Sequence, residues 1–475
     1  MFKKPVYPEV EPVKLKPFKG IRPGVYILAI LGLCLLLILF ALFLLPGMVS
    51  HASYVQFDVP LSAVAIYEDD IYLGNASSSI YRTTAGTHNY RLEYQGAVVS
   101  NFEEKAEHHY FFTLFSHHVQ RIVPTYTFSD VVKEKMMNDF ASSVAAYSAV
   151  TDYSSSYNFP PLFTNFATDA VALGIKNVED LWLYAAMHVT SSTMYEDYLQ
   201  GKKILNTSSI AYNSHELSNV EKDLSVMFDS SKATSVQRIN ETSTVAPTST
   251  GKYISYKEGK VTMGNTTKVT YPEINELPVT VEYGPFSIGT TVVTEYDYAL
   301  LVAANPMSAK SNLEALKADG LVDDYYLGGI TLSTYAKSKR PIRNISWYAA
   351  KAYTEWLSAS TGVAFTLPTE AEWTVAALSS EAKGYTTALI SEDTDNSTPI
   401  GMLGQLWEFT DSAYIPLGRV SYERATLLSK EYPFDAIIVK GGSYANESSA
   451  ISTETVGVMN KNVCSEFCGF RVVMR

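Results

Sequence analysis

Two cysteines near the end of the chain have a spacing that could support chemistry. Cys464 and Cys468 form a C-x-x-x-C pair. Cysteine thiolates bind soft metals and exchange disulfides, and in an oxidising compartment such a pair can also close a small loop. We expect a disulfide between Cys464 and Cys468, with a free or redox-active pair as the alternative. The bridge requires a turn, because an extended segment would hold the two Cα atoms too far apart.

Four histidines in the segment HHYFFTLFSHH are the second group with chemical potential: His108, His109, His117 and His118. Neutral imidazole is a common zinc ligand. In a strand, however, neighbouring side chains point to opposite faces, so only one histidine of each pair could join a given site. No carboxylate or cysteine is placed to complete it. We therefore interpret these histidines as polar ends of strands.

Glu370 and Glu372 in the segment LPTEAEW are a third candidate, since paired carboxylates can act as acid and base. Pro368 suits the start of a helix, which would place both carboxylates near its positive N-terminal end. No histidine lies nearby in sequence. Helix capping and a buried ion pair are therefore the prediction for these residues.

The elements that must position these residues belong to a chain of 475 residues, which is enough for two to four domains. A hydrophobic fraction of 47% excludes a disordered chain, and three cysteines cannot form a disulfide framework. The formal net charge of −12 argues against a nucleic-acid partner. The mean hydropathy is zero, but this average conceals one very apolar segment.

That segment, residues 25–45, contains no charge and no proline. As a helix it would extend about 31 Å, which matches the hydrocarbon core of a bilayer. Residues 1–24 carry six basic and two acidic side chains, so the positive-inside rule predicts a cytoplasmic tail followed by a transmembrane helix over residues 25–46. A cleaved signal peptide is the alternative, although its apolar region would be shorter and closer to the start. The rest of the chain has a formal net charge of −16.

Residues 54–123 alternate in polarity and are interrupted by turn residues, which predicts short strands. Asp69 and Asp70 mark one turn, and Gly74, Gly86 and Gly96 mark others. The segment resembles a PEGA domain, a small β-sandwich-like module, in Val59-Pro60, in the hairpin VAIYEDDIYLG and in AGTH leading into YRL. The resemblance implies a spacer or adhesive unit.

Residues 129–228 change to a helical period. Apolar residues follow a Ser129-Asp130 cap at intervals of four, a second helix is predicted over residues 178–199, and a third includes Leu217 and Leu224. Residues 229–251 are rich in Ser and Thr and predict a linker.

Residues 252–475 contain ordered motifs that resemble the formylglycine-generating enzyme, or sulfatase-modifying factor, family. The motifs are GKVTMG (259–264), FSIG (286–289), PIRNISWYAAKAYTEWL (341–357), LPTEAEW (367–373), GQLWEFTD (404–411), GGSY (441–444) and GFR (469–471). The resemblance implies a C-type-lectin-like fold. The whole chain is therefore expected to be α+β: a single transmembrane helix, a PEGA-like β domain, a helical insert and this C-terminal domain.

Family resemblance implies that catalysis needs two cysteines, at the second and seventh residues after GGSY, which bind copper as thiolates. In this chain Asn446 and Ile451 occupy those positions, so copper is not expected and no residue is predicted to be catalytic. Trp407 and Ser443 match residues that line the family's pocket. Together with Asn446 they are the candidate pocket residues.

The resemblance also implies a calcium site made by the Glu408 carboxylate and the backbone carbonyls of Gly404 and Leu406. Its fourth ligand, an asparagine in the family, is Gly401 here. The sequence thus predicts at most a weak calcium site.

We expect a bacterial protein anchored once in the inner (cytoplasmic) membrane, with most of the chain periplasmic or extracellular. Its C-terminal domain is expected to bind or scaffold other envelope proteins rather than to catalyse. Two alternatives remain open. One is an enzyme, either a formylglycine-generating oxidase or a catalyst of related thiol chemistry through Cys464 and Cys468. The other is a glycan-binding or peptide-binding protein.

Overall fold

The structure is a computed structural model that describes residues 16–61, 63–75, 79–149, 160–228, 248–249, 252–264, 279–380, 385–389, 398–416 and 420–475. It divides into two compact units, residues 1–132 and 133–475, which are described separately. Most of the predicted linker lies outside the described residues. Its only described part, Thr248–Ser249, is not a linker but a short strand, β8.

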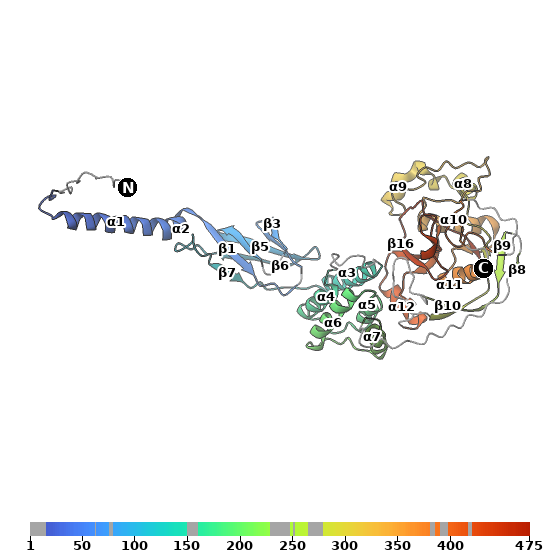
Figure 1. Cartoon of the computed structure of the whole chain (residues 1–475), viewed down its shortest axis with the longest axis horizontal. Coiled ribbons are helices and arrows are strands. Elements are labelled where there is room, and N and C mark those ends of the chain that lie inside the picture. The colour runs from blue at the N-terminus through green and yellow to red at the C-terminus, as the bar shows by residue number, and fades with distance from the viewer. Residues whose placement is uncertain are drawn as a thin grey trace, which may run out of the picture. The chain divides into compact units, whose positions relative to one another are not determined.

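The first unit begins with helix α1 (Pro23–Phe43), which leads through the short helix α2 (Leu45–Val49) into a β domain (Figure 1). All residues of α1 between Val25 and Phe43 are apolar, and none of its side chains is buried. Among the described residues, α1 alone is long and apolar enough to cross a membrane. The predicted apolar helix is therefore confirmed. Pro46, which has no N–H to donate, lies just beyond the end of α1.

The β domain contains the strands expected within residues 54–123. They are β1 (Ala52–Phe57), β2 (Ala65–Glu68), β3 (Ile71–Gly74), β4 (Ile80–Thr84), β5 (Gly86–Tyr94), β6 (Ala97–Ala106) and β7 (Val119–Ile122). One sheet has the order β4-β1-β7 and the other β3-β2-β5-β6. Asp69 and Asp70 both have positive φ, 48° and 65°, which is the geometry of a two-residue hairpin turn. The predicted turn at this position is confirmed.

The histidine-rich segment is not part of a strand. Residues 107–118 form the loop between β6 and β7, in which the His109 and His118 rings lie 4.0 Å apart between centroids. The argument from alternating strand faces therefore does not apply, since the loop brings one histidine of each pair together.

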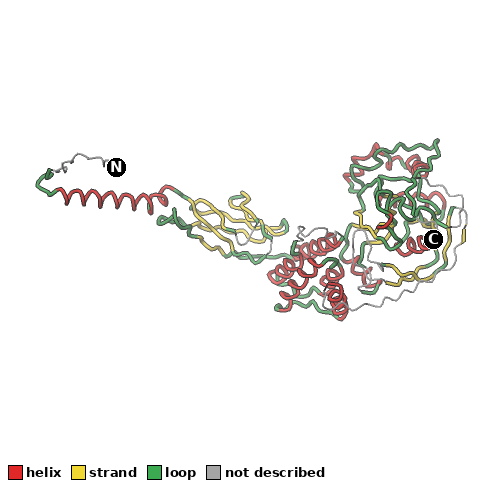
Figure 2. The backbone as a smooth tube through the Cα atoms, in the orientation of Figure 1, coloured by secondary structure: helices red, strands yellow, loops and turns green. Residues whose placement is uncertain are grey.

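The second unit opens with a group of helices, drawn in red in Figure 2. They are α3 (Asp130–Ser148), α4 (Leu162–Ala172), α5 (Glu179–Met187), α6 (Ser192–Asn206) and α7 (His215–Phe228). The prediction of one helix over residues 178–199 is wrong: the Ser191 hydroxyl accepts a hydrogen bond from the Met194 N–H and starts a new helix. Helix α4 was not predicted. Trp182 and Phe163 are fully buried at the centre of the group, with their rings 5.3 Å apart.

The C-terminal part of this unit combines small sheets with helices. Its strands are β9 (Tyr253–Tyr256), β10 (Gly259–Met263), β11 (Val279–Tyr283), β12 (Phe286–Gly289), β13 (Phe365–Thr366), β14 (Trp407–Ala413), β15 (Ala436–Lys440), β16 (Val456–Asn460), β17 (Cys468–Gly469) and β18 (Val473–Met474). Its helices are α8 (Glu295–Ala304), α9 (Leu313–Ala318), α10 (Trp347–Thr361), α11 (Glu370–Ser379) and α12 (Tyr422–Glu431). The strand orders are β13-β18-β12-β9-β8 and β16-β15-β14-β17, beside the hairpin β10-β11.

Local signals start the two helices that carry family motifs. The Ser346 hydroxyl accepts a hydrogen bond from the Ala349 N–H at the start of α10. Thr369 and Glu372 form a reciprocal capping box at the start of α11. The predicted capping role of Glu372 is therefore confirmed.

Contacts join the helical group to the C-terminal domain within this unit. The Tyr414 and Ser148 hydroxyl oxygens lie 3.3 Å apart in a buried hydrogen bond. The Arg424 guanidinium, on α12, forms ion pairs with Asp180 and with Glu216, the latter at 3.1 Å.

Candidate functional site

An ion pair between Glu408 and Arg471 lies at the centre of the C-terminal domain, and both side chains are fully buried. The Arg471 guanidinium donates to the two carboxylate oxygens from Nε and Nη2, each over 2.6 Å. The Trp373 indole Nε1 donates to Glu408 Oε2 over 2.9 Å. The remaining guanidinium donors reach the backbone carbonyls of Gly289 and Ile400 at 3.1 and 3.0 Å. The Glu408 carboxylate and the Arg471 guanidinium thus have hydrogen-bond partners inside the protein for all their oxygen and nitrogen atoms.

This pairing does not fit the expected calcium site. The Glu408 carboxylate is already neutralised by Arg471, and a divalent cation beside a buried guanidinium would face like-charge repulsion. In the part of the chain that the structure describes, no group of three or more His, Cys, Asp or Glu residues is placed to hold a metal.

A second buried pair joins Glu370, on α11, to Lys440, at the end of β15, with 3.6 Å between Oε1 and Nζ. The Lys440 ammonium also lies 5.6 Å from the centroid of the Trp373 ring. Burial raises the pKa of the Glu370 carboxyl, and the neighbouring Lys440 charge opposes this shift. The predicted buried ion pair is confirmed for Glu370.

Of the three candidate pocket residues, Trp407 and Ser443 are buried and Asn446 is half-buried. Trp407 is 8% exposed, and its ring lies against Gly457 of β16. The Ser443 hydroxyl and backbone N–H both donate to the Asn446 Oδ1, over 3.0 and 2.9 Å. The structure therefore brings Ser443 and Asn446 together in a turn. The Tyr385 hydroxyl donates to the Asn446 carbonyl over 2.7 Å and covers this turn.

Ile451, at the second of the family's copper-binding positions, is also packed. Its side chain lies against Gly442, which has φ 68° and no room for a Cβ. The Asn446 amide oxygen is used within its turn. Since neither side chain offers a thiolate, the residues at these positions do not fit a copper ion.

The expected disulfide is not formed: Cys464 and Cys468 are both free thiols and both buried. The Cys464 backbone N–H donates to Asp323 Oδ2 over 3.1 Å, and Cys468 begins β17, which pairs with β14. These contacts fix the two backbones separately, and each sulfur lies 3.8 Å from a backbone carbonyl nearby. Burial raises the pKa of Cys464 to about 12 and that of Cys468 well above its ordinary value. Thiolate chemistry at either sulfur is therefore disfavoured.

A groove of about 330 Å³ on the same domain was not predicted from the sequence. It is lined along α10 by Trp347, Lys351 and Glu355, and from other segments by Tyr298 and Tyr326. The first three residues recur at intervals of four, so the helical period could have shown that they share one face. Aromatic rings beside charged groups can bind a glycan or a peptide.

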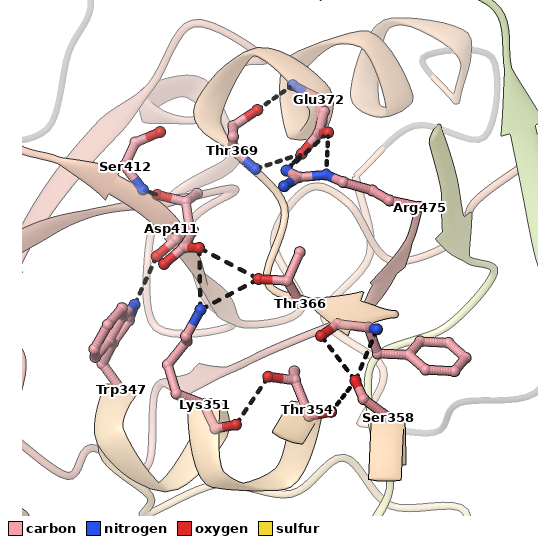
Figure 3. A network of polar contacts seen from close by, with 12 residues as sticks. Trp347, Lys351, Thr354, Ser358, Thr366, Thr369, Glu372, Asp411, Ser412 and Arg475 are labelled. Atoms are coloured by element: carbon pink, nitrogen blue, oxygen red, sulfur yellow. Dashed lines mark hydrogen bonds and ion pairs between the residues drawn. The ribbon is translucent and has the colours of Figure 1, made fainter. Parts of the chain in front are cut away.

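The polar side of this groove is held by a hydrogen-bond network (Figure 3). The Lys351 ammonium lies 3.1 Å from Asp411 Oδ2 and 3.2 Å from the Thr366 hydroxyl. The Trp347 indole Nε1 donates to the Thr410 carbonyl over 2.9 Å, and the Lys351 ammonium lies 5.5 Å from the centre of its ring. The network fixes the orientation of the tryptophan and of the lysine before any ligand binds.

Comparison with known proteins agrees with the four motifs between residues 259 and 373. Residues 239–399 match the family described as "Sulfatase-modifying factor enzyme 1-like domain". An uncharacterized protein of Borreliella burgdorferi is 22% identical over 409 residues, which cover 77% of this chain and 79% of that protein.

Solved structures similar to about half of this chain include PvdO from Pseudomonas aeruginosa, with 15% identity, a TM-score of 0.33, and coverage of 49% of this chain and 99% of that one. Treponema denticola variable protein 1 has 18% identity, a TM-score of 0.31, and coverage of 50% and 100%. CarF has 17% identity, a TM-score of 0.30, and coverage of 47% and 97%. The family match alone shows that residues 239–399 carry a domain of the sulfatase-modifying factor type.

Proposed function

We propose that this chain is a single-pass membrane protein of the bacterial envelope, whose sulfatase-modifying factor domain binds or scaffolds partners without catalysing oxidation. The observation that carries the proposal is the residue pair Asn446 and Ile451, which replaces both copper thiolates. The two cysteines of the same domain do not compensate, because both are buried as thiols.

Copper content and oxidase activity test the non-catalytic part of the proposal. Full-length protein in detergent is incubated with Cu(I), and bound copper and the oxidation of a cysteine-containing sulfatase peptide to formylglycine are measured. We expect neither. Stoichiometric copper that disappears when Cys464 or Cys468 is changed to serine would refute the proposal. The matched control is Cys34→Ser, which changes the only cysteine outside this domain.

Membrane anchoring by α1 would place the acidic remainder of the chain outside the cytoplasm. The six basic residues before α1 support this orientation. Protease treatment of intact spheroplasts should digest the C-terminal domain and protect the N-terminal tail. Cross-linking of native membranes followed by purification of the chain would identify envelope partners, and recovery of the chain without any partner would count against the scaffold role.

The aromatic groove favours glycan or peptide binding as a second candidate function. Trp347 lies in the groove and is partly exposed, whereas Trp407 is buried, so Trp347 is the residue to test. Binding of the full-length protein to an array of glycans and cell-wall peptides should be lost in Trp347→Ala. Tyr335→Ala is the control, because Tyr335 is 96% exposed and does not line the groove. Equal binding by the two variants would exclude the groove.

A further inference from the structure

The loop between β6 and β7 exposes an unusual concentration of apolar side chains. Between Tyr110 and Phe115 only Thr113 is not a large apolar or aromatic residue. The exposed fractions are 53% for Tyr110, 64% for Phe111, 53% for Phe112, 58% for Leu114 and 62% for Phe115. A soluble domain rarely leaves so many neighbouring aromatic side chains in water, so this surface is expected to be covered.

The loop is attached to the end of the apolar helix α1. The Phe112 backbone N–H donates to the Phe43 carbonyl over 2.9 Å. The ring of Phe43 lies 4.8 Å from that of Phe112 and 5.5 Å from that of Phe115, between centroids. Gly47 adds to the contact, since any Cβ there would overlap the Tyr110 carbonyl. These contacts are internal to the first unit and fix the depth of the loop relative to α1.

That depth corresponds to one boundary of a bilayer. The apolar run that begins at Val25 needs about 30 Å of hydrocarbon, so Phe43 lies near the boundary on the side of the β domain. Phe112 and Phe115 contact Phe43 and must lie at the same level. Tyrosine and other aromatic side chains are favoured at this level, where apolar rings meet polar headgroups.

Polar residues flank the apolar segment on both sides. His108 and His109 precede it and His117 and His118 follow it, while Glu107 is the only carboxylate in residues 107–118. A segment with an apolar centre and polar ends is typical of one that lies at the boundary between lipid and water without crossing the membrane.

We infer that residues 110–115 are a second membrane contact, which inserts beside α1 into the outer boundary of the lipid bilayer and holds the β domain against its surface. The occupant of this apolar surface is lipid because the loop continues the surface of α1, which has no buried side chain within the first unit. The inference rests on the proposed membrane anchoring by α1.

Depth-dependent quenching in lipid nanodiscs tests the inference on the full-length chain. A polarity-sensitive fluorophore is attached to Phe111→Cys in a Cys34→Ala background, in which Cys464 and Cys468 remain buried and unreactive. Lipids with a nitroxide high on the acyl chain should quench it at least twofold more than aqueous iodide does. The same fluorophore on Ile71→Cys, which is 70% exposed on a hairpin of the same domain, should show the reverse. Leu114→Cys provides a second position in the loop.

The fluorophore on native Cys34, within α1, separates failure of this inference from failure of the anchoring proposal. Lipid quenching at Cys34 but not at positions 111 and 114 would overturn the inference and leave the anchor intact. Absence of lipid quenching at Cys34 would refute the anchor as well. The fluorophore at position 111 could also be protected from iodide in a way that depends on protein concentration, without quenching by the nitroxide lipids. That result would show that another protein covers the loop, and it would also overturn the inference.

Discussion

Replacement of Arg471 by methionine should destabilise the C-terminal domain by about 3–5 kcal/mol, because it leaves the Glu408 carboxylate buried without its counter-charge. Both side chains are fully buried, so water cannot reach the carboxylate to compensate. The substitution also removes the donors to the Gly289 and Ile400 carbonyls. Methionine retains much of the volume of arginine, so an empty cavity contributes little to the expected loss.

Arg475→Met is the matched control, because Arg475 also forms a two-pronged ion pair, with Glu372, but its side chain is 44% exposed. Exposed pairs contribute at most about 1 kcal/mol. Urea unfolding of the full-length protein in detergent is followed by tryptophan fluorescence, since four of the five tryptophans belong to this domain. The double variant Glu408→Gln/Arg471→Met should recover part of the loss. Equal destabilisation by Arg471→Met and Arg475→Met would refute the reasoning.

Three further outcomes are expected. Because burial raises their pKa, Cys464 and Cys468 should resist iodoacetamide at about pH 8 in the folded protein and react fully in urea; ready modification of the folded form would contradict the structure. Burial opposes the charged form of His88, but hydrogen bonds to Asp69 and to the Thr84 carbonyl raise its pKa overall. The contribution of His88 to the stability of the β domain should therefore be present below about pH 6.5 and lost as the pH rises through the folded-state pKa. His88→Gln should abolish this dependence in urea unfolding at several pH values, and an unchanged profile would exclude the assignment. Tyr414→Phe should weaken the connection to the helical group by about 1 kcal/mol, and no change in the urea midpoint would show that the hydrogen bond contributes nothing.

The sequence was most informative where one short segment determines the outcome. A run of uncharged apolar residues predicted α1, and Pro368 with the two following glutamates predicted the start of α11. Each of these features depends on neighbours within one helix. The family motifs added the type of the C-terminal domain, because several of them occur in a fixed order.

The sequence was least informative where residues distant along the chain meet. Glu408 and Arg471 are 63 positions apart, and nothing local indicates that the carboxylate binds a guanidinium rather than calcium. The spacing of Cys464 and Cys468 permitted a disulfide, but both are buried free thiols whose backbones bond to Asp323 and to strand β14. Trp407 matched a pocket residue by motif, yet the packing of β16 decides its exposure.

The motif residues and the copper positions belong to separable parts of this fold. Trp373, Glu408 and Arg471 come from three different motifs and meet in one buried network that stabilises the domain. Asn446 and Ile451 lie in the segment after β15, outside that network. Neither side chain bonds to the ion pair, so the network does not depend on the residues at these two positions. For this reason the motifs are evidence of the fold and not of an activity.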